Sequence, residues 1–269
     1  MITIDPNKAI GIFDSGIGGL TVLKAIEEAL PHENLIYLGD TARVPYGNKS
    51  RETITRYSVE NTQFLIQSGV KAVVVACNTA SALGLPELRK LFDLPVIGVI
   101  EPGARAALAT TKSREVGVIG TESTVSSSSY SKAIQSIDAK VRVWGIACPL
   151  FVPLAEEGWI HNEITESVAH KYLAPFLKTP IDTLILGCTH YPLLKGMIGK
   201  VMGEKVSLVD SAQETARCVK ELLQEKNLQR KDTARRNETL FVTDSPARFK
   251  EVGRNFLNRP LDGVTLVTL

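Results

Sequence analysis

The sequence predicts an α/β protein of two similar lobes, each a mostly parallel sheet flanked by helices, with an active site between them. Three observations support this prediction. Short apolar, β-branched runs alternate along the chain with amphipathic stretches of helical period. Most of the runs are apolar throughout, which is typical of parallel sheets covered on both faces. A similar order of strands and polar strand ends also occurs in each half of the chain.

The apolar runs predict strands, and the longer amphipathic stretches between them predict helices. In chain order, the predicted strands are Ala9–Phe13, Leu35–Leu38, Ala72–Ala76, Val96–Val99, Val116–Ile119, Val141–Ile146, Thr183–Leu186, Val206–Val209, Thr239–Val242 and Val264–Val267. The predicted helices include Leu20–Leu30, Thr53–Ser68, Leu85–Leu91, Glu163–Leu177 and Ala212–Glu225.

The two halves of the chain form an internal near-repeat. In the first half, an early strand ends at Asp14 and a later strand ends at Cys77. In the second half, an early strand ends at Thr121 and a later strand ends at Cys188, at a similar distance along the chain. This repetition predicts two related lobes that face each other.

The lobe boundaries are predicted at two positions. One falls near Glu101, Pro102 and Gly103, and the other near Asp210 and Ser211. The first lobe would then comprise residues 1–100 together with 212–269, and the second lobe would comprise residues 101–211. The strong helix that begins after Ser211 is expected to pack back on the first lobe.

The composition excludes several classes of protein. The chain has 269 residues, of which 44% are hydrophobic and 22% charged, and its formal net charge is +2. This charge is too close to neutral to indicate a nucleic-acid or membrane partner. The N-terminal stretch lacks a basic region followed by an apolar signal segment, and no apolar run approaches the length of a membrane span. We expect a soluble, cytoplasmic protein.

Small polar clusters follow three of the predicted strands. They are Asp14 with Ser15, Cys77 with Asn78 and Thr79, and Cys188 with Thr189 and His190. In open α/β sheets, ligands bind at the carboxyl ends of the strands. Backbone N–H groups at such strand-to-helix turns also bind carboxylates or phosphates. These clusters are therefore the candidate functional site.

Two of the four cysteines differ from the others in their position. Cys148, which precedes a proline, and Cys218, inside a predicted helix, fit small buried hydrophobic residues. Cys77 and Cys188 each stand at the turn after a strand, with polar donors next in the chain, and such surroundings lower the pKa of a thiol. Scattered cysteines in a cytoplasmic chain argue against a disulfide framework.

Two thiols from facing lobes suit a reaction that inverts a carbon centre. One thiolate removes the α-proton from one face while the opposite thiol supplies a proton to the other, and the roles exchange in the reverse direction. Hydrogen-bond donors must stabilise the substrate carboxylate as charge flows into it. Asn78, Thr79, Thr189 and the backbone amides of the turns are suitable donors.

Two titratable residues of the clusters allow alternative interpretations. Asp14 before Ser15 suits an ordinary turn or helix N-cap, and equally a partner for a substrate ammonium group or for the Cys77 proton. His190 suits a structural histidine, and equally a group that orients or protonates the Cys188 side of the site.

Two further segments also allow alternatives. Pro45, Tyr46 and Gly47 indicate a structured loop, which is either a plain turn or a segment whose Tyr46 side chain and Gly47 amide close over a small ligand. Glu156 follows an apolar stretch, and burial there would raise its pKa. The adjacent Glu157 instead favours a surface helix end.

Three other functions compete with proton transfer. A dinucleotide site is suggested by the glycines from Gly16 onward, but the third glycine of the fingerprint is missing. A zinc site of Cys77, Cys188 and His190 lacks any supporting ligand spacing. A non-catalytic amino-acid-binding module would explain the polar clusters but leaves the paired thiols without a role.

Five motifs together carry a resemblance to a known family. They are FDSGIGGLTV (13–22), YLGDTARVPYGNKS (37–50), VVACNTASA (74–82), PLFVPLAEEG (149–158) and LGCTHYPLL (186–194). In this order and spacing they are very specific, and over nearly its whole length the chain resembles the glutamate racemases of the aspartate/glutamate racemase family. The resemblance implies glutamate as the substrate, no cofactor and no metal, a role in supplying D-glutamate for bacterial peptidoglycan, and a homodimer.

The resemblance also implies roles for individual residues. Cys77 would deprotonate the D-isomer and Cys188 the L-isomer, and the auxiliary catalytic residues would be Asp14, Glu156 and His190. The implied substrate-contacting residues are Asp14, Ser15, Tyr46, Gly47, Asn78, Thr79, Thr189 and His190. Pro45, which precedes Tyr46, and Thr121, at the tip of the first strand of the second half, complete the predicted binding set.

Overall fold

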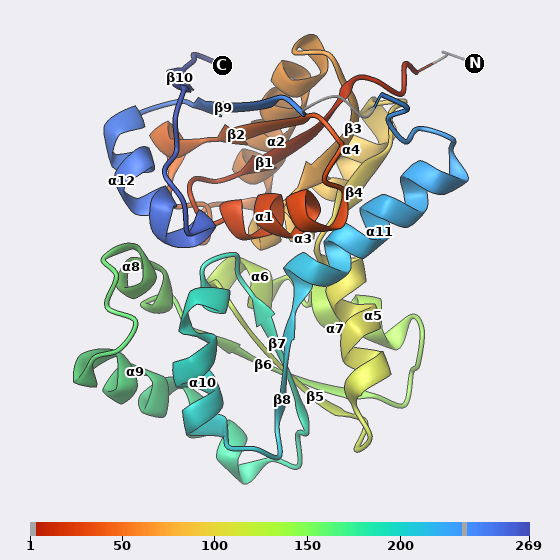
Figure 1. The fold of residues 1–269 in the computed structure, drawn as a ribbon. Coiled ribbons are helices and arrows are strands. Elements are labelled where there is room, and N and C mark those ends of the chain that lie inside the picture. Colours follow the sequence, from red (N-terminus) through yellow and green to blue (C-terminus); the bar gives the residue numbers. More distant parts are fainter. Residues whose placement is uncertain (1–3, 233–235) are drawn as a thin grey trace.

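The computed structural model describes residues 4–232 and 236–269, and within them ten strands form two sheets (Figure 1). In sheet order, the six-stranded sheet is β10 (Val264–Leu266), β9 (Glu238–Val242), β2 (Leu35–Gly39), β1 (Ala9–Asp14), β3 (Val70–Val75) and β4 (Val96–Gly98). The four-stranded sheet is β6 (Arg142–Ala147), β5 (Glu115–Gly120), β7 (Thr183–Gly187) and β8 (Ser207–Asp210). Every strand pairing is parallel, which confirms the predicted fold class.

The two sheets share one strand order. In the first sheet β2, β1, β3 and β4 are neighbours, and in the second β6, β5, β7 and β8 are neighbours, so each places its second, first, third and fourth strands side by side. In such an order the second strand lies on one side of the first strand, and the third and fourth strands lie on its other side. A crevice for a ligand opens at the carboxyl ends of these two strands. Each lobe therefore offers its own binding edge, and in Figure 1 these edges face each other.

Helices connect and cover the strands. Their bounds are α1 (Leu20–Ala29), α2 (Arg51–Gln67), α3 (Asn78–Leu83), α4 (Leu85–Leu91), α5 (Ile100–Thr110), α6 (Glu122–Ser126), α7 (Ser129–Gln135), α8 (Phe151–Glu156), α9 (Glu163–Leu173), α10 (Lys195–Met202), α11 (Ser211–Glu225) and α12 (Pro246–Leu257). Three 3₁₀ turns lie at η1 (Thr41–Arg43), η2 (Phe176–Lys178) and η3 (Tyr191–Leu194).

The predicted strands all form, with their ends shifted by up to two residues. The predicted helix Glu163–Leu177 is shorter than expected, because α9 ends at Leu173 and Pro175 follows, which cannot donate a helical hydrogen bond. Several short helices, α3 among them, were not predicted, since they span too few residues to show a helical period. β6 also departs from the expected two-sided cover, because it lies at a sheet edge and exposes Arg142 and Trp144.

The core of the first lobe has two layers. Ile10 and Ile12 of β1 pack into the cluster that contains residues of α1, α11 and α12, and the alternate residue Phe13 packs into the cluster that contains residues of α2. The second cluster continues through Ala104 and Ala107 of α5 into the strands of the second sheet. The two lobes are thus joined by a shared apolar core.

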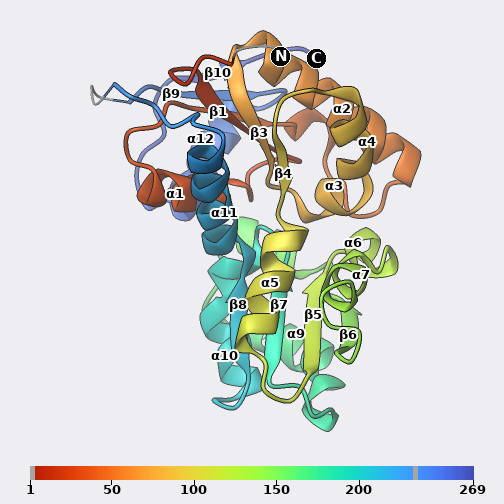
Figure 2. The ribbon, with the colours of Figure 1, turned by 90° about the vertical axis from the view of Figure 1, so that its right-hand side faces the viewer.

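Two helices run between the sheets. α5 and α11 lie side by side there, and α11 also packs along α1 (Figure 2). Glu101, Pro102 and Gly103, where the first boundary is predicted, lie inside α5. The division of the chain at residues 100 and 211 stays a prediction. No helix among the described residues is both long and apolar enough to cross a membrane.

A buried ion pair anchors the end of the first sheet that lies away from the pocket. Lys71, at the start of β3, is fully buried, and its ammonium group donates to the Glu33 carboxylate and, at 2.7 Å, to the Pro6 carbonyl. The other Glu33 oxygen accepts the Arg230 backbone N–H at 2.9 Å. The pair therefore fastens four segments of the chain, around Pro6, Glu33, Lys71 and Arg230.

We expect Lys71→Met to lower the free energy of unfolding by about 3 kcal/mol, because it leaves the Glu33 carboxylate buried without its cation. Urea denaturation followed by circular dichroism would measure the change. The matched control is Lys90→Met, which removes an exposed lysine paired with Glu87 and should cost less than about 1 kcal/mol. Equal losses in the two variants would contradict this account.

Candidate active site

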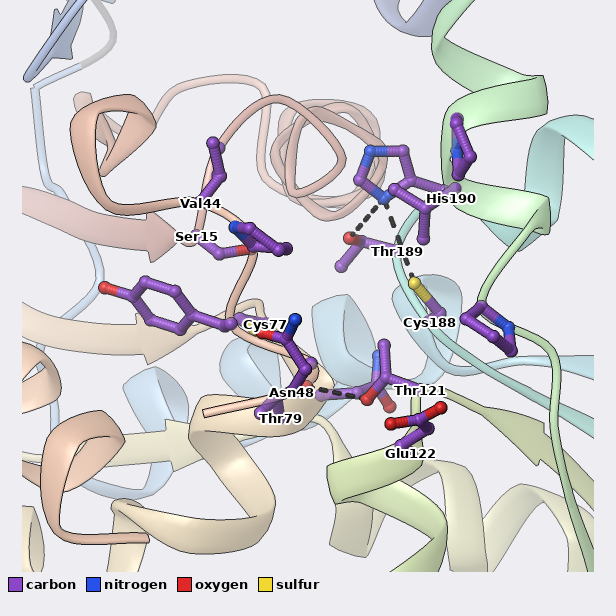
Figure 3. A pocket seen from close by; sticks show the side chains of 18 of the residues that line it. Ser15, Val44, Asn48, Cys77, Thr79, Thr121, Glu122, Cys188, Thr189 and His190 are labelled. Atoms are coloured by element: carbon purple, nitrogen blue, oxygen red, sulfur yellow. Dashed lines mark hydrogen bonds between the residues drawn. The ribbon is translucent and has the colours of Figure 1, made fainter. Parts of the chain in front are cut away.

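A pocket of about 470 Å³ lies where the carboxyl ends of the two sheets face each other. Residues of both lobes surround it, with Ser15 and Cys77 on one side and Cys188 and His190 on the other (Figure 3). Its lining comprises Ser15, Gly16, Val44, Pro45, Tyr46, Gly47, Asn48, Cys77, Asn78, Thr79, Thr121, Glu122, Pro149, Val152, Pro153, Glu156, Cys188, Thr189 and His190. The structure thus brings together every predicted site residue except Asp14, which is buried next to Ser15 and does not line the pocket.

Asp14, at the end of β1, is fully buried. One carboxylate oxygen accepts the Gly16 N–H at 3.0 Å, and the other has no hydrogen-bond partner in the part of the chain that the structure describes. Burial raises the pKa of Asp14, and the charge of His190 opposes that shift. A Cβ added to Gly19 would lie 2.4 Å from the Asp14 Cβ, so glycine is needed there for the turn to close over this carboxylate. Asp14 is therefore a positioned, incompletely satisfied acid rather than an ordinary turn residue.

Cys77 follows β3 and caps helix α3. Its Sγ accepts the Ala80 N–H at 3.5 Å. The pKa of this thiol is raised to about 12, first by burial and then by the nearby Asp14 carboxylate, and these causes outweigh the helix N–H. The expected lowering of the Cys77 pKa is therefore wrong for this state of the site. At neutral pH the Cys77 side chain is a thiol, which is suited to donate a proton.

Asn78 and Thr79 present hydrogen-bonding groups beside Cys77. The Asn78 amide oxygen accepts the Tyr130 hydroxyl at 2.7 Å, while its NH₂ group is buried and has no partner among the described residues. The Thr79 and Thr121 hydroxyls lie 2.9 Å apart and link the first turn to the second-lobe turn that caps α6. All three residues line the pocket and carry donors that a substrate carboxylate could use.

Cys188, at the end of β7, has a different electrostatic environment. Its Sγ lies 3.8 Å from His190 Nδ1 (Figure 3). His190 Nε2 lies 2.9 Å from a Glu156 carboxylate oxygen. Burial alone would lower the pKa of His190, but the hydrogen bonds with Cys188 and Glu156 outweigh it and raise that pKa to about 10. His190 is therefore an imidazolium at neutral pH and places a positive charge beside the Cys188 sulfur.

Glu156 does not sit on a plain surface helix end. It is the last residue of α8, lines the pocket, and its side chain is 35% exposed. Burial acts to raise its pKa, yet the hydrogen bond and charge of His190, together with the charge of Arg248, outweigh burial and the pKa is lowered. Glu156 thus ends a helix, as one sequence interpretation supposed, and also lines the pocket. The other interpretation, a pKa raised by burial, is wrong, because His190 from a distant strand end favours the ionised carboxylate.

The loop that carries Pro45, Tyr46 and Gly47 closes one side of the pocket. The Tyr46 hydroxyl donates to the buried carboxylate of Asp40 and accepts from the Asn61 amide at 3.1 Å, so it points into the first lobe rather than toward a ligand. The Gly47 carbonyl accepts from the Ser123 N–H at 3.0 Å and from its hydroxyl at 2.8 Å. The loop therefore bridges the lobes through its backbone.

The pocket also contains residues that the sequence did not predict. They are Gly16, Val44, Asn48, Glu122, Pro149, Val152 and Pro153. Most of these residues lie in the segments that follow the predicted strands. In such segments the sequence has no periodic pattern that shows which side chains point into a pocket. Among the described residues, no group of three or more His, Cys, Asp or Glu side chains is placed to hold a metal ion.

The arrangement defines a class of chemistry. Two thiols, one from each lobe, line one small pocket that also offers oriented N–H and O–H donors. Each thiol has a separate titratable neighbour, Asp14 for Cys77 and His190 for Cys188. Such a site can move a proton at either face of a small substrate.

Comparisons with known proteins agree with this chemistry. The family model for Asp/Glu/Hydantoin racemase matches residues 10–219. A glutamate racemase of Geobacter metallireducens is 58% identical over 98% of both chains, and one of Neisseria meningitidis is 46% identical over 100% of both. A crystal structure of glutamate racemase from Bacillus anthracis superposes with a TM-score of 0.94 at 41% identity, over 98% of both chains. One from Francisella tularensis, in complex with D-glutamate, has a TM-score of 0.92 at 39% identity, also over 98% of both.

The protein is an enzyme of the racemase class, an isomerase that acts on an amino acid. More particularly, the chain belongs to the Asp/Glu/hydantoin racemase family.

The contact between His190 and Glu156 yields a pH prediction. Because the folded pKa of His190 is about 10 and the unfolded value is about 6.5, the contacts of His190 with Cys188 and Glu156 together stabilise the protein fully below about pH 6.5. That stabilisation is lost as the pH rises through about 10. Glu156→Gln should lower the pKa of His190 by at least about one unit, since a charge-assisted hydrogen bond contributes about 1.5–3 kcal/mol.

Titration of the labelled imidazole by NMR would measure this pKa. The matched control is Glu157→Gln, which changes the adjacent exposed carboxylate that pairs with Arg248. That control should leave the His190 titration where it is in the parent protein. A Glu156→Gln variant with the parent titration curve would show that another group keeps His190 charged.

Proposed function

We propose that the protein interconverts L- and D-glutamate by a cofactor-independent proton transfer between two thiols. The observation that carries the proposal is the placement of Cys77 and Cys188 at equivalent strand ends of two facing lobes, in one pocket. A racemase needs a base on one face of the α-carbon and an acid on the other, and two groups fixed on opposite walls meet that need.

The proposed reaction has one proton leaving and one arriving. With L-glutamate, the Cys188 thiolate takes the α-proton, the electron pair of the C–H bond moves toward the carboxylate, and the Cys77 thiol delivers its proton to the opposite face. With D-glutamate the thiols exchange roles. The raised pKa of Cys77 and the positive charge of His190 beside Cys188 support this starting state for the L-isomer. Asp14 and the pair of Glu156 with His190 would assist at the two thiols.

Substrate binding would rely on neutral donors and backbone N–H groups. The unpartnered Asn78 NH₂ and the hydroxyls of Thr79 and Thr121 support a carboxylate site near Cys77. Ser15, Pro45, Gly47 and Thr189 would complete the contacts, together with parts of Tyr46 other than its hydroxyl, which is bound to Asp40 and Asn61. The choice of glutamate over other amino acids rests on the relatives, which are glutamate racemases, one of them in complex with D-glutamate.

The cellular role follows from the same resemblance. We infer that the enzyme acts in the cytoplasm of a bacterium, as a homodimer, and supplies D-glutamate for peptidoglycan. The bacterial glutamate racemases that match the whole chain support this role. The test of assembly is the molar mass in solution, measured by light scattering.

The two-thiol mechanism predicts that Cys77→Ser and Cys188→Ser each lower kcat/KM by about 10²–10⁴-fold, the contribution of a positioned acid or base. A serine hydroxyl is a far weaker acid than a thiol, and the fold should be retained because the change is nearly isosteric. Cys148→Ser and Cys218→Ser are the matched controls, since neither sulfur lines the pocket. Full activity in either pocket variant would exclude the mechanism.

Proton exchange tests the reaction and its substrate together. The purified protein, treated with chelator and given no cofactor, is incubated with L-glutamate in D₂O. We expect optical rotation to be lost while deuterium enters the α-position, which NMR would detect. Exchange with L-aspartate alone would keep the chemistry and correct the substrate. Binding of glutamate without any exchange would favour a non-catalytic binding module.

A further inference from the structure

A tyrosine outside the pocket contacts the turns that carry both thiols. Tyr130, in α7, is 2% exposed and donates its hydroxyl to the amide oxygen of Asn78, the residue after Cys77. A Cβ added to Gly187, the residue before Cys188, would lie 3.1 Å from Cε2 of the Tyr130 ring. The ring therefore lies between the two thiol-bearing strand ends without lining the pocket itself.

The position of the Tyr130 hydroxyl is fixed by its surroundings. A Cβ added to Gly103 of α5 would lie 3.2 Å from this hydroxyl, so a larger residue there would press on it. The Ser211 side chain hydrogen-bonds to the same phenol oxygen, and burial raises the pKa of Tyr130 above its ordinary value. The phenol is thus protonated at every working pH, and in the structure it donates to the Asn78 oxygen.

This hydrogen bond determines how the Asn78 amide is oriented. An asparagine side chain can rotate so that either its oxygen or its NH₂ group faces a ligand. With its oxygen held by Tyr130, its NH₂ group is left buried without a protein partner, on a residue that lines the pocket. A buried N–H without an acceptor is costly, so the site is arranged for an acceptor that arrives with the substrate.

We propose that Tyr130 is a positioning residue for racemisation: it holds the Asn78 amide so that its N–H, and not its oxygen, meets the substrate carboxylate. The inference rests on the proposed function, because the acceptor is the carboxylate of the amino acid. Tyr130 lies in the part of the chain that forms the second sheet, and Asn78 lies in the part that forms the first. The hydrogen bond that orients the Asn78 amide therefore forms only when the two lobes are at the spacing seen here.

The test is a double-mutant cycle between Tyr130→Phe and Asn78→Ala, with KM and kcat measured for both isomers of glutamate. Tyr130→Phe should raise KM about 10-fold, because the freed amide can present its oxygen to the carboxylate. If Tyr130 acts through Asn78, adding Tyr130→Phe to Asn78→Ala should change neither constant further. The matched control is Tyr191→Phe, an equally buried tyrosine of the same lobe that donates to the Cys148 carbonyl.

Several results would overturn the inference. One is a Tyr130→Phe enzyme with the parent KM. Another is an equal loss when Tyr130→Phe is added to Asn78→Ala, which would mark a merely structural role. A third is the same rise in KM in Tyr191→Phe. A parent protein without activity on glutamate would instead overturn the proposed function. The inference is then decided by whether D-glutamate raises the thermal midpoint of the parent more than that of Tyr130→Phe.

Discussion

The close approach of two sheet edges is the constraint on which the site depends. A Cβ added to Gly18 of the first lobe would lie 2.3 Å from the Thr189 hydroxyl oxygen and 2.5 Å from the His190 ring, and one on Gly47 would lie 2.7 Å from the Thr121 Cβ. Backbone without side chains is therefore what lets the lobes meet on two sides of the pocket. Without that contact, the thiols would belong to two separate crevices, each able to reach one face of a substrate at most.

The lobes repeat their strand order, yet the two thiols have different titratable neighbours. Cys77 lies beside the buried carboxyl group of Asp14, whereas Cys188 lies beside an imidazolium whose charge Cys188 itself and the Glu156 carboxylate favour. Burial acts on both sides, so the difference comes from the neighbours. One wall of the pocket carries a thiol and the other a sulfur with a cationic partner. The two sides of the pocket are therefore electrostatically different, although the fold that carries them is nearly symmetric.

The sequence predicted the parts of the site that depend on local order. A polar residue directly after a buried parallel strand must emerge at the carboxyl edge, so Cys77, Thr121 and Cys188 could be placed without coordinates. It did not predict the ionised state of Glu156, which depends on His190, thirty-four positions later in the chain. Nor did it show the partners of Tyr46 and Asn78, because no sequence period records which distant side chain will meet them.

An asymmetric site is compatible with a reaction whose two ends are mirror images. Enantiomers of an amino acid have equal free energy in water, so the equilibrium constant is one and kcat/KM must be the same in both directions. The charge difference between Cys77 and Cys188 can therefore appear only in kcat and KM separately, by changing how tightly each isomer is bound before its proton leaves. A near-symmetric fold supplies the two faces, and the unequal neighbours of the thiols set how each isomer is bound.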